Sequence, residues 1–196
     1  MKHFSIFRHG QTEWNVLNVW QGAQIDAELN ETGKLQAKEL KEKLSALKVE
    51  AVYSSPLCRA LQTAIIANPN PVNTYLCPDL RECNFGVAEG KTFAEMEIDY
   101  PEIVYAMFHP TPDQWEKKFP GEGSECKKEV FERVKAALLE IGKNSKYTNI
   151  GIATHAAVMS SLFAGTGHYK TPVPNCCVAH FVYDEEKNEL SFVEMV

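Results

Sequence analysis

Short apolar segments of strand length alternate with segments of helical periodicity along the 196 residues of this chain. The strand-like segments are Phe4–Phe7, Ala51–Tyr53, Val72–Leu76, Ile150–Ala153, Val178–Tyr183 and Leu190–Val193. The helical segments, with apolar residues every three or four positions, are 31–47, 57–67, 125–141 and 156–164. This alternation predicts an α/β fold, a three-layer sandwich in which helices flank a largely parallel central sheet.

Local signals place the beginnings of two helices. Asn30 is a favoured N-cap residue for the helix over 31–47. We expect Ser55 to cap the helix that follows it, with Pro56 at the first helical position. The last two strands lie on either side of Asp184–Asn188 and predict a closing hairpin.

Length and an even composition predict one domain over residues 1–196. Glycine and proline are frequent across residues 85–123, which predicts an insertion of loops and short helices. We expect this insertion to cover the functional site.

Charge and cysteine usage exclude several classes of protein. The chain has 20 Lys and Arg residues against 26 Asp and Glu residues, a formal charge of −6. Such a balance argues against general binding of nucleic acid or anionic membranes, which depends on basic patches. No apolar run approaches the roughly 18 residues of a membrane helix. The six cysteines show no C-x-x-C spacing, so we expect reduced thiols in a cytoplasmic protein.

Cationic and imidazole side chains follow three of the predicted strands. The first strand leads into Arg8 and His9, the second is followed by Arg59 one turn into its helix, and a later strand ends before His155. Because ligands of such folds bind beyond the carboxyl ends of the strands, these side chains should converge at one sheet edge. Arginine recognises phosphate or carboxylate with its forked N–H groups, and helix N-termini favour anions. The arrangement predicts a pocket for a compact polyanion such as phosphate.

Longer motifs surround these residues. They read Arg8-His9-Gly10-Gln11-Thr12-Glu13-Trp14-Asn15, Gln21-Gly22, Tyr53-Ser54-Ser55-Pro56-Leu57-x-Arg59-Ala60, Leu80-Arg81-Glu82-x-x-Phe85-Gly86 and Thr154-His155. In this order and spacing, from Phe4 to about Leu162, the chain resembles the histidine phosphatase family, also called the phosphoglycerate mutase-like family, and its phosphatase branch.

The resemblance implies five catalytic residues. His9 matches the nucleophile that accepts the phosphoryl group as a phosphohistidine, and the charges of Arg8 and Arg59 would keep its imidazole neutral. Arg8, Arg59 and His155 match the phosphate clamp. Glu82 matches the general acid that protonates the leaving oxygen and then the base that activates water.

Four further residues match positions that contact phosphate or substrate: Asn15, Gln21, Gly22 and Ala156. Ala156 stands where the family usually has glycine, but its backbone N–H donor is unaffected by that change. The segment Gly121–Glu125 departs from the family pattern, so no substrate role is assigned there.

The resemblance implies a metal-independent phosphatase without a cofactor, acting on a small phosphorylated metabolite. Phosphoserine is the first expectation, with 3-phosphoglycerate and the α-ribazole phosphate of cobalamin synthesis as alternatives. A homodimer is also expected, because several members of the family form one. A cofactor-dependent phosphoglycerate mutase is the main competing interpretation. Mutases carry extra basic residues in the middle segment, whereas residues 91–120 contain only three lysines.

Two interpretations from other classes stay open. The sequence Gly86-x-x-x-Gly90-Lys91-Thr92 is one residue shorter than a nucleotide-binding P-loop. A catalytically inactive phosphate-binding module would retain the same pocket without turnover. No D-x-D or H-x-x-x-H spacing indicates a metal site.

Overall fold

The computed structural model describes residues 1–109, 111–169 and 172–196. Its strands are β1 (Lys2–Arg8), β2 (Ala51–Ser54), β3 (Thr74–Leu76), β4 (Asn149–Thr154), β5 (Val178–Asp184) and β6 (Glu189–Met195). Its α-helices are α1 (Glu13–Val16), α2 (Glu31–Ala46), α3 (Cys58–Ala67), α4 (Phe93–Asp99), α5 (Pro101–Phe108), α6 (Lys127–Asn144) and α7 (Ala156–Gly165). The 3-10 turns are η1 (Pro71–Asn73), η2 (Pro78–Leu80), η3 (Gly86–Ala88) and η4 (Pro112–Gln114).

The six strands form one sheet in the order β3-β2-β4-β1-β5-β6. The pairs among β3, β2, β4 and β1 are parallel, whereas β5 pairs antiparallel with both β1 and β6. Because β5 and β6 are joined only by residues 185–188, they form the predicted hairpin. The largely parallel α/β fold predicted from the strand–helix alternation is confirmed.

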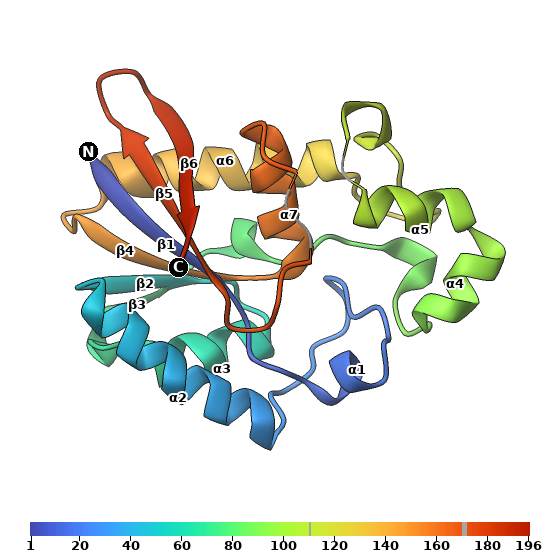
Figure 1. Ribbon diagram of the computed structural model, residues 1–196, viewed down its shortest axis with the longest axis horizontal. Coiled ribbons are helices and arrows are strands. Elements are labelled where there is room, and N and C mark those ends of the chain that lie inside the picture. The colour runs from blue at the N-terminus through green and yellow to red at the C-terminus, as the bar shows by residue number, and fades with distance from the viewer. Residues whose placement is uncertain (110, 170–171) are drawn as a thin grey trace.

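Helices cover both faces of this sheet (Figure 1). Successive side chains of β1 point to opposite faces, so Phe4 and Ile6 pack in the core on the side of α6 and α7. Phe7 packs instead with Leu40 of α2 and Ala64 of α3. Apolar side chains on both faces of the central strand explain why it is buried on both sides.

The beginning of α3 differs from the sequence-based expectation. The helix begins at Cys58, with Leu57 as its N-cap residue, so Pro56 lies before the helix rather than at its first position. The Ser55 hydroxyl accepts a hydrogen bond from the Leu57 N–H but does not cap the helix. Asp26 supplies the missing acceptor from another loop, since its Oδ1 accepts from the Cys58 N–H at 2.5 Å. A long-range contact therefore replaces the expected local cap.

The two ends of the predicted insertion meet, since the Val87 N–H donates to the Pro120 carbonyl at 2.9 Å, and its middle contains α4 and α5, which lie away from the sheet (Figure 1). Thr92 begins α4 with a capping box to Glu95, and Pro101 begins α5 immediately after α4 ends. The segment that resembles a P-loop begins with the turn η3 and ends at Thr92, the N-cap residue of α4. A P-loop follows directly on a strand, whereas no strand of the described residues directly precedes η3.

Candidate active site

Three strands end side by side and bring their following residues to one edge of the sheet. Arg8 pairs with Thr154 in the β1–β4 register, and Ser54 pairs with Ala153 in the β2–β4 register. The alignment continues past the strands, because the His9 N–H donates to the Thr154 carbonyl at 3.0 Å. The parallel register thus places the segment Arg8-His9 beside the segment Thr154-His155, as expected from the sequence.

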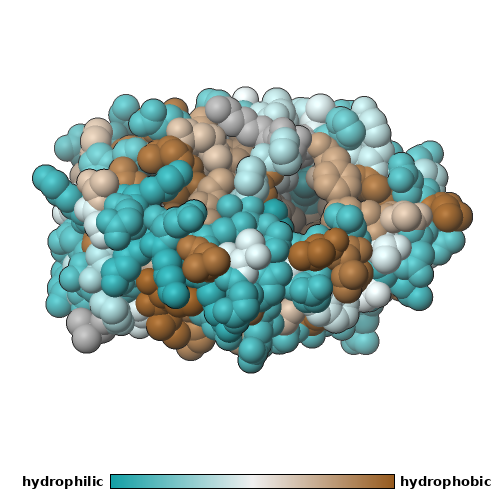
Figure 2. Space-filling view, turned by 60° about the horizontal axis from the view of Figure 1, so that its bottom comes forward, coloured by the Kyte–Doolittle hydropathy of each residue, from teal (hydrophilic) through white to brown (hydrophobic). Residues whose placement is uncertain are grey.

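A cavity of about 300 Å³ opens at this edge of the sheet. The space-filling view shows a hollow in the surface with hydrophobic side chains beside it (Figure 2). Predicted site residues that line the cavity are Arg8, His9, Asn15, Gln21, Gly22, Arg59, Glu82 and Ala156. The structure therefore brings together eight of the nine residues selected from the sequence.

The imidazole of His9 is held in a defined tautomer. Its Nδ1 lies 2.7 Å from the Gly10 carbonyl oxygen, which can only accept, so Nδ1 carries the proton. The Gly10 N–H in turn donates to the Thr63 hydroxyl at 2.9 Å, which fixes the turn. Burial, followed by the charges of Arg8 and Arg59, holds the pKa of His9 well below its ordinary value of 6.5. At neutral pH the Nε2 atom therefore carries a lone pair that can act as a nucleophile.

Two guanidinium groups flank this histidine, that of the buried Arg59 and that of the partly buried Arg8. Arg59 is 1% exposed and donates from Nη1 to the Ile25 carbonyl and from Nη2 to the Gly22 carbonyl, at 2.8 and 2.7 Å. Arg8 donates from Nη1 to the Val173 carbonyl at 2.7 Å. The Nε atom of each arginine is buried and has no hydrogen-bond acceptor among the described residues. Such donors are costly to bury unless an anion meets them, so the pair is suited to bind phosphate oxygens.

Glu82 contributes the acidic group of the cavity and is 6% exposed. Its Oε1 accepts from the Cys83 N–H at 2.9 Å, and its Oε2 accepts from the Ala157 N–H at 3.3 Å. The Thr154 hydroxyl also donates to the Leu80 carbonyl at 2.8 Å, which ties the preceding turn to the end of β4. These contacts hold a carboxyl group beside the cavity that the arginines face, where it can exchange a proton with a bound ester.

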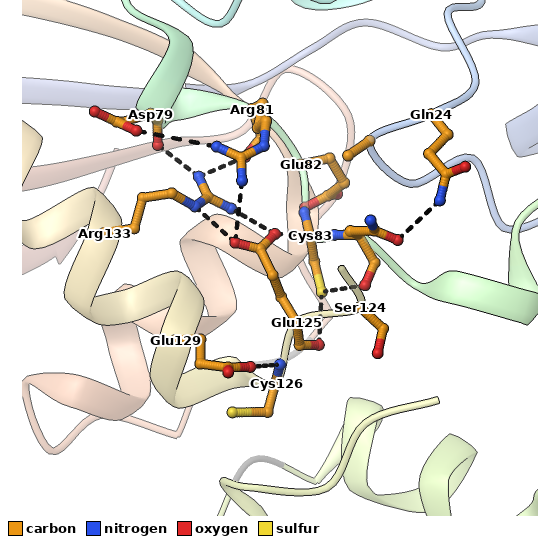
Figure 3. A network of polar contacts seen from close by, with 12 residues as sticks. Gln24, Asp79, Arg81, Glu82, Cys83, Ser124, Glu125, Cys126, Glu129 and Arg133 are labelled. Carbon is orange, nitrogen blue, oxygen red and sulfur yellow. Dashed lines mark hydrogen bonds and ion pairs between the residues drawn. The ribbon is translucent and has the colours of Figure 1, made fainter. Parts of the chain in front are cut away.

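A network centred on Glu125 fixes the segment that carries Glu82 (Figure 3). Arg133 of α6 binds both Glu125 oxygens, at 2.9 and 3.0 Å, and the Asn84 N–H donates to Glu125 Oε2 at 3.0 Å. Arg133 Nη1 also donates to the Arg81 carbonyl. Among the described residues that line the cavity, none comes from 121–125, so Glu125 positions the neighbouring loop instead of contacting the cavity.

His155 packs against His9. It is fully buried and does not line the cavity, unlike its neighbour Ala156. Its ring centroid lies 5.3 Å from that of His9, and its Nε2 lies 2.8 Å from the Ser55 hydroxyl. Burial, followed by the charges of Arg59 and His9, holds its pKa well below 6.5. Its Nδ1 atom is buried and has no hydrogen-bond partner among the described residues, so the clamp role expected for His155 stays a prediction.

The polar residues at the mouth present donors to the cavity. The Thr12 N–H donates to Asn15 Oδ1 at 3.0 Å, and the Thr12 hydroxyl donates to Gln21 Oε1 at 3.0 Å. These bonds occupy the amide oxygens and leave the NH₂ groups of Asn15 and Gln21 as donors. Gly22 has φ +59°, and a Cβ there would collide with the Glu89 carboxylate, so this turn requires glycine.

Sequence reasoning missed the buried lysine of the cavity wall. Lys127 and Ser160 both line the cavity, and Lys127 Nζ donates to the Ser160 hydroxyl at 2.8 Å. A signal was present, because Lys127 shares the buried face of α6 with Val130 and Val134, three and seven residues further on. A cation at a core position of an amphipathic helix is unusual enough to indicate a site.

The aromatic part of the wall was also missed. It consists of Trp14, Trp20, Phe85, Phe93 and Phe108. Three of these residues belong to the glycine- and proline-rich segment, whose short helices carry too little periodicity to show which side chains face inwards. These aromatic side chains give the cavity an apolar surface, against which an apolar portion of a ligand can pack while its phosphate meets the arginines.

The described residues contain no group of three or more His, Cys, Asp or Glu side chains placed to hold a metal ion. Within the described ranges no helix has both the length and the apolar character needed to cross a membrane.

Comparison with known proteins agrees with this geometry. The model of the histidine phosphatase superfamily (branch 1) matches residues 4–195. Phosphoglycerate mutase-like protein 4 of Arabidopsis thaliana is 35% identical over 161 residues, covering 81% of this chain and 68% of that protein. The metal-independent phosphoserine phosphatase of the same plant is 33% identical over 165 residues, covering 81% and 66%.

A solved structure has the same fold over the whole chain. The crystal structure of a phosphoserine phosphatase mutant from Entamoeba histolytica, in complex with phosphoserine, superimposes with a TM-score of 0.81. The two sequences are 25% identical, and the match covers 100% of this chain and 96% of the other. The protein therefore belongs to the histidine phosphatase superfamily and is a phosphatase of the histidine phosphatase type.

Proposed function

We propose that this protein hydrolyses small phosphate monoesters without a metal ion, through a phosphohistidine intermediate at His9. The observation that carries the proposal is the state of the His9 imidazole. Its Nδ1 proton is held by the Gly10 carbonyl and its pKa is lowered, so Nε2 is a free base at neutral pH.

In the first step His9 Nε2 forms a bond to phosphorus as the bond from phosphorus to the ester oxygen breaks. Arg8 and Arg59 bind the non-bridging oxygens through their unpartnered N–H groups and stabilise the charge that spreads over them. Glu82 donates its proton to the departing alkoxide, which leaves as an alcohol.

In the second step a water molecule attacks the phosphohistidine as Glu82 takes a proton from it. The N–P bond breaks, the lone pair returns to His9 Nε2, and inorganic phosphate is released. Asn15, Gln21 and the Ala156 N–H are proposed to hold phosphate oxygens through both steps, since all three line the cavity.

Phosphoserine is the proposed substrate, with 3-phosphoglycerate and α-ribazole phosphate as alternatives. Two similar proteins with phosphoserine phosphatase in their names support the first choice. A phosphoglycerate mutase has less support, because the middle segment offers few cations to hold a bisphosphate. Lys117 and Lys118 of that segment pair with Glu102 and Glu129 and do not line the cavity.

Hydrolysis of p-nitrophenyl phosphate in the presence of a chelator tests the proposal. Wild-type protein should release p-nitrophenol between acidic and neutral pH, and His9→Ala should not. Absence of turnover by the wild-type protein would instead favour an inactive phosphate-binding module. Product analysis with 3-phosphoglycerate separates hydrolysis, which releases inorganic phosphate, from mutase activity, which yields the 2-phospho isomer.

A further inference from the structure

Lys127 is a buried cation that the proposed reaction does not use. It is the first residue of α6 and is 2% exposed, yet its side chain lines the cavity together with Ser160 of α7. The Nζ atom donates to the Ser160 hydroxyl at 2.8 Å, the one hydrogen bond that it makes to a described residue. An ammonium group has three N–H donors, so two of them lack an acceptor among the described residues.

The amine is charged under ordinary conditions. Burial lowers the pKa of Lys127 to about 8, so at pH 7 the ammonium form outnumbers the neutral amine by about ten to one. No carboxylate of the described residues lies within ion-pair distance of Nζ, and the more distant Cys83 and Glu82 raise the pKa of Lys127 by less than burial lowers it. Its hydroxyl partner is neutral and does not offset the charge.

A charge removed from water without a directly paired counterion is strongly destabilising to a folded protein. Lysine side chains at a surface avoid this cost by extending their ammonium group into solvent. The Lys127 ammonium instead lies where α6 packs against α7, and it lines a ligand-sized cavity. A perturbed, unpaired charge in such a place is typical of groups that meet a ligand.

The other residues that line the cavity restrict which ligand group that can be. Phe85, Phe93 and Met107 give the cavity apolar surface. Among the described residues that line it, the cations besides Lys127 are Arg8 and Arg59, so Lys127 is the cation left for a further anionic group. One ammonium and one hydroxyl provide donors for the two oxygens of a carboxylate. A second phosphate dianion would call for a larger cationic set, such as the two arginines beside His9.

We propose that Lys127 and Ser160 form a second anion subsite, which binds the carboxylate of a phosphate monoester whose alcohol part carries one. This inference rests on the proposed function, because it assumes that the phosphoryl group lies between the arginines. It narrows the substrate class to phosphorylated hydroxy or amino acids and disfavours neutral alcohol phosphates.

Binding of two matched phosphonates tests the subsite without turnover. 4-Phosphonobutyrate and butylphosphonate share the phosphonate and the alkyl chain, and only the first has a carboxylate. Titration calorimetry should show that wild-type protein binds 4-phosphonobutyrate about 10- to 100-fold more tightly, the usual range for a hydrogen bond to a charged group. Lys127→Met should bring this ratio close to one.

Lys128→Met is the matched control, because it removes the same charge from the adjacent residue. Lys128 is half-exposed and pairs with Glu116 at 2.7 Å on the surface, so its replacement should leave the ratio at the wild-type value. Ser160→Ala provides a second variant with an intact ammonium, and we expect a smaller loss of the ratio, about 3- to 10-fold.

Two results would overturn the subsite. One is equal affinity of the wild-type protein for both phosphonates. The other is an equal loss of affinity for both ligands in Lys127→Met, which a purely structural lysine would give. Failure of the proposed function shows separately, as absence of p-nitrophenyl phosphate hydrolysis by the wild-type protein, and leaves the phosphonate measurement informative.

Discussion

Replacement of Glu82 by glutamine separates its chemical role from its structural one. Glutamine has the same shape but cannot donate a carboxyl proton or act as a base. Its carbonyl oxygen can still accept from the Cys83 N–H, whereas its NH₂ group would face the Ala157 N–H at the position of Oε2. Loss of that one hydrogen bond should lower the free energy of unfolding by about 1–2 kcal/mol. The variant should therefore fold, and thermal unfolding should show a modest decrease in Tm.

The catalytic effect should depend on the leaving group. A positioned general acid contributes about 10²- to 10⁴-fold when the leaving oxygen needs a proton. An alkyl phosphate should therefore lose that factor in kcat/KM, while p-nitrophenyl phosphate should lose less than about tenfold because p-nitrophenolate leaves without a proton. Since kcat/KM reports steps up to departure of the alcohol, slower hydrolysis of the phosphoenzyme does not obscure the comparison.

Steady-state kinetics on both esters, with the wild-type protein and Glu82→Gln measured at the same pH, provide the comparison. An equal loss of kcat/KM on the two esters would remove Glu82 from the acid role. An unfolding free energy lowered by much more than one hydrogen bond would instead show that the carboxylate is chiefly structural.

Three further predictions follow from the same site. Arg59→Met should reduce kcat about 10²- to 10³-fold, the loss typical of one preorganised donor, and a change below tenfold in the same assay would contradict a clamp role. His9 should remain neutral as the pH is lowered through 6.5, because its pKa lies well below that value; isotope-labelled histidine NMR would contradict this if His9 titrated at 6.5 or above. Gly22→Ala should destabilise the loop through its positive φ and the collision with Glu89, lowering Tm and phosphate affinity together, and an unchanged Tm would show that the loop adapts.

The fold was largely predictable because periodicity and strand-end chemistry are local signals. The six strands occur where apolar runs predicted them, and parallel register then placed Arg8 and His155 at the same sheet edge. The exceptions have nonlocal causes. The α3 start depends on Asp26, which lies 32 residues away from the N–H group that it caps, and no local cap rule contains that contact.

The site was predictable as a set of residues but not as an arrangement. Strand ends indicated where Arg59 and His9 would meet, yet not that His155 would pack beside His9 without lining the cavity. The pairing of Lys127 with Ser160 depends on the packing of α6 against α7, because that packing brings the ammonium and the hydroxyl within hydrogen-bond distance. Tertiary packing therefore decides which buried polar side chains line the cavity, as Lys127 does and His155 does not.

The most direct test of the account is identification of the phosphorylated atom during turnover. Rapid quenching of the wild-type protein with a phosphate monoester, followed by peptide mapping, should reveal a phosphoryl group on Nε2 of His9. The adduct should be stable in base and labile in acid, form and decay at rates compatible with turnover, and be absent from His9→Ala. Turnover that proceeds through an adduct on another residue, or that persists in His9→Ala, would contradict the central claim.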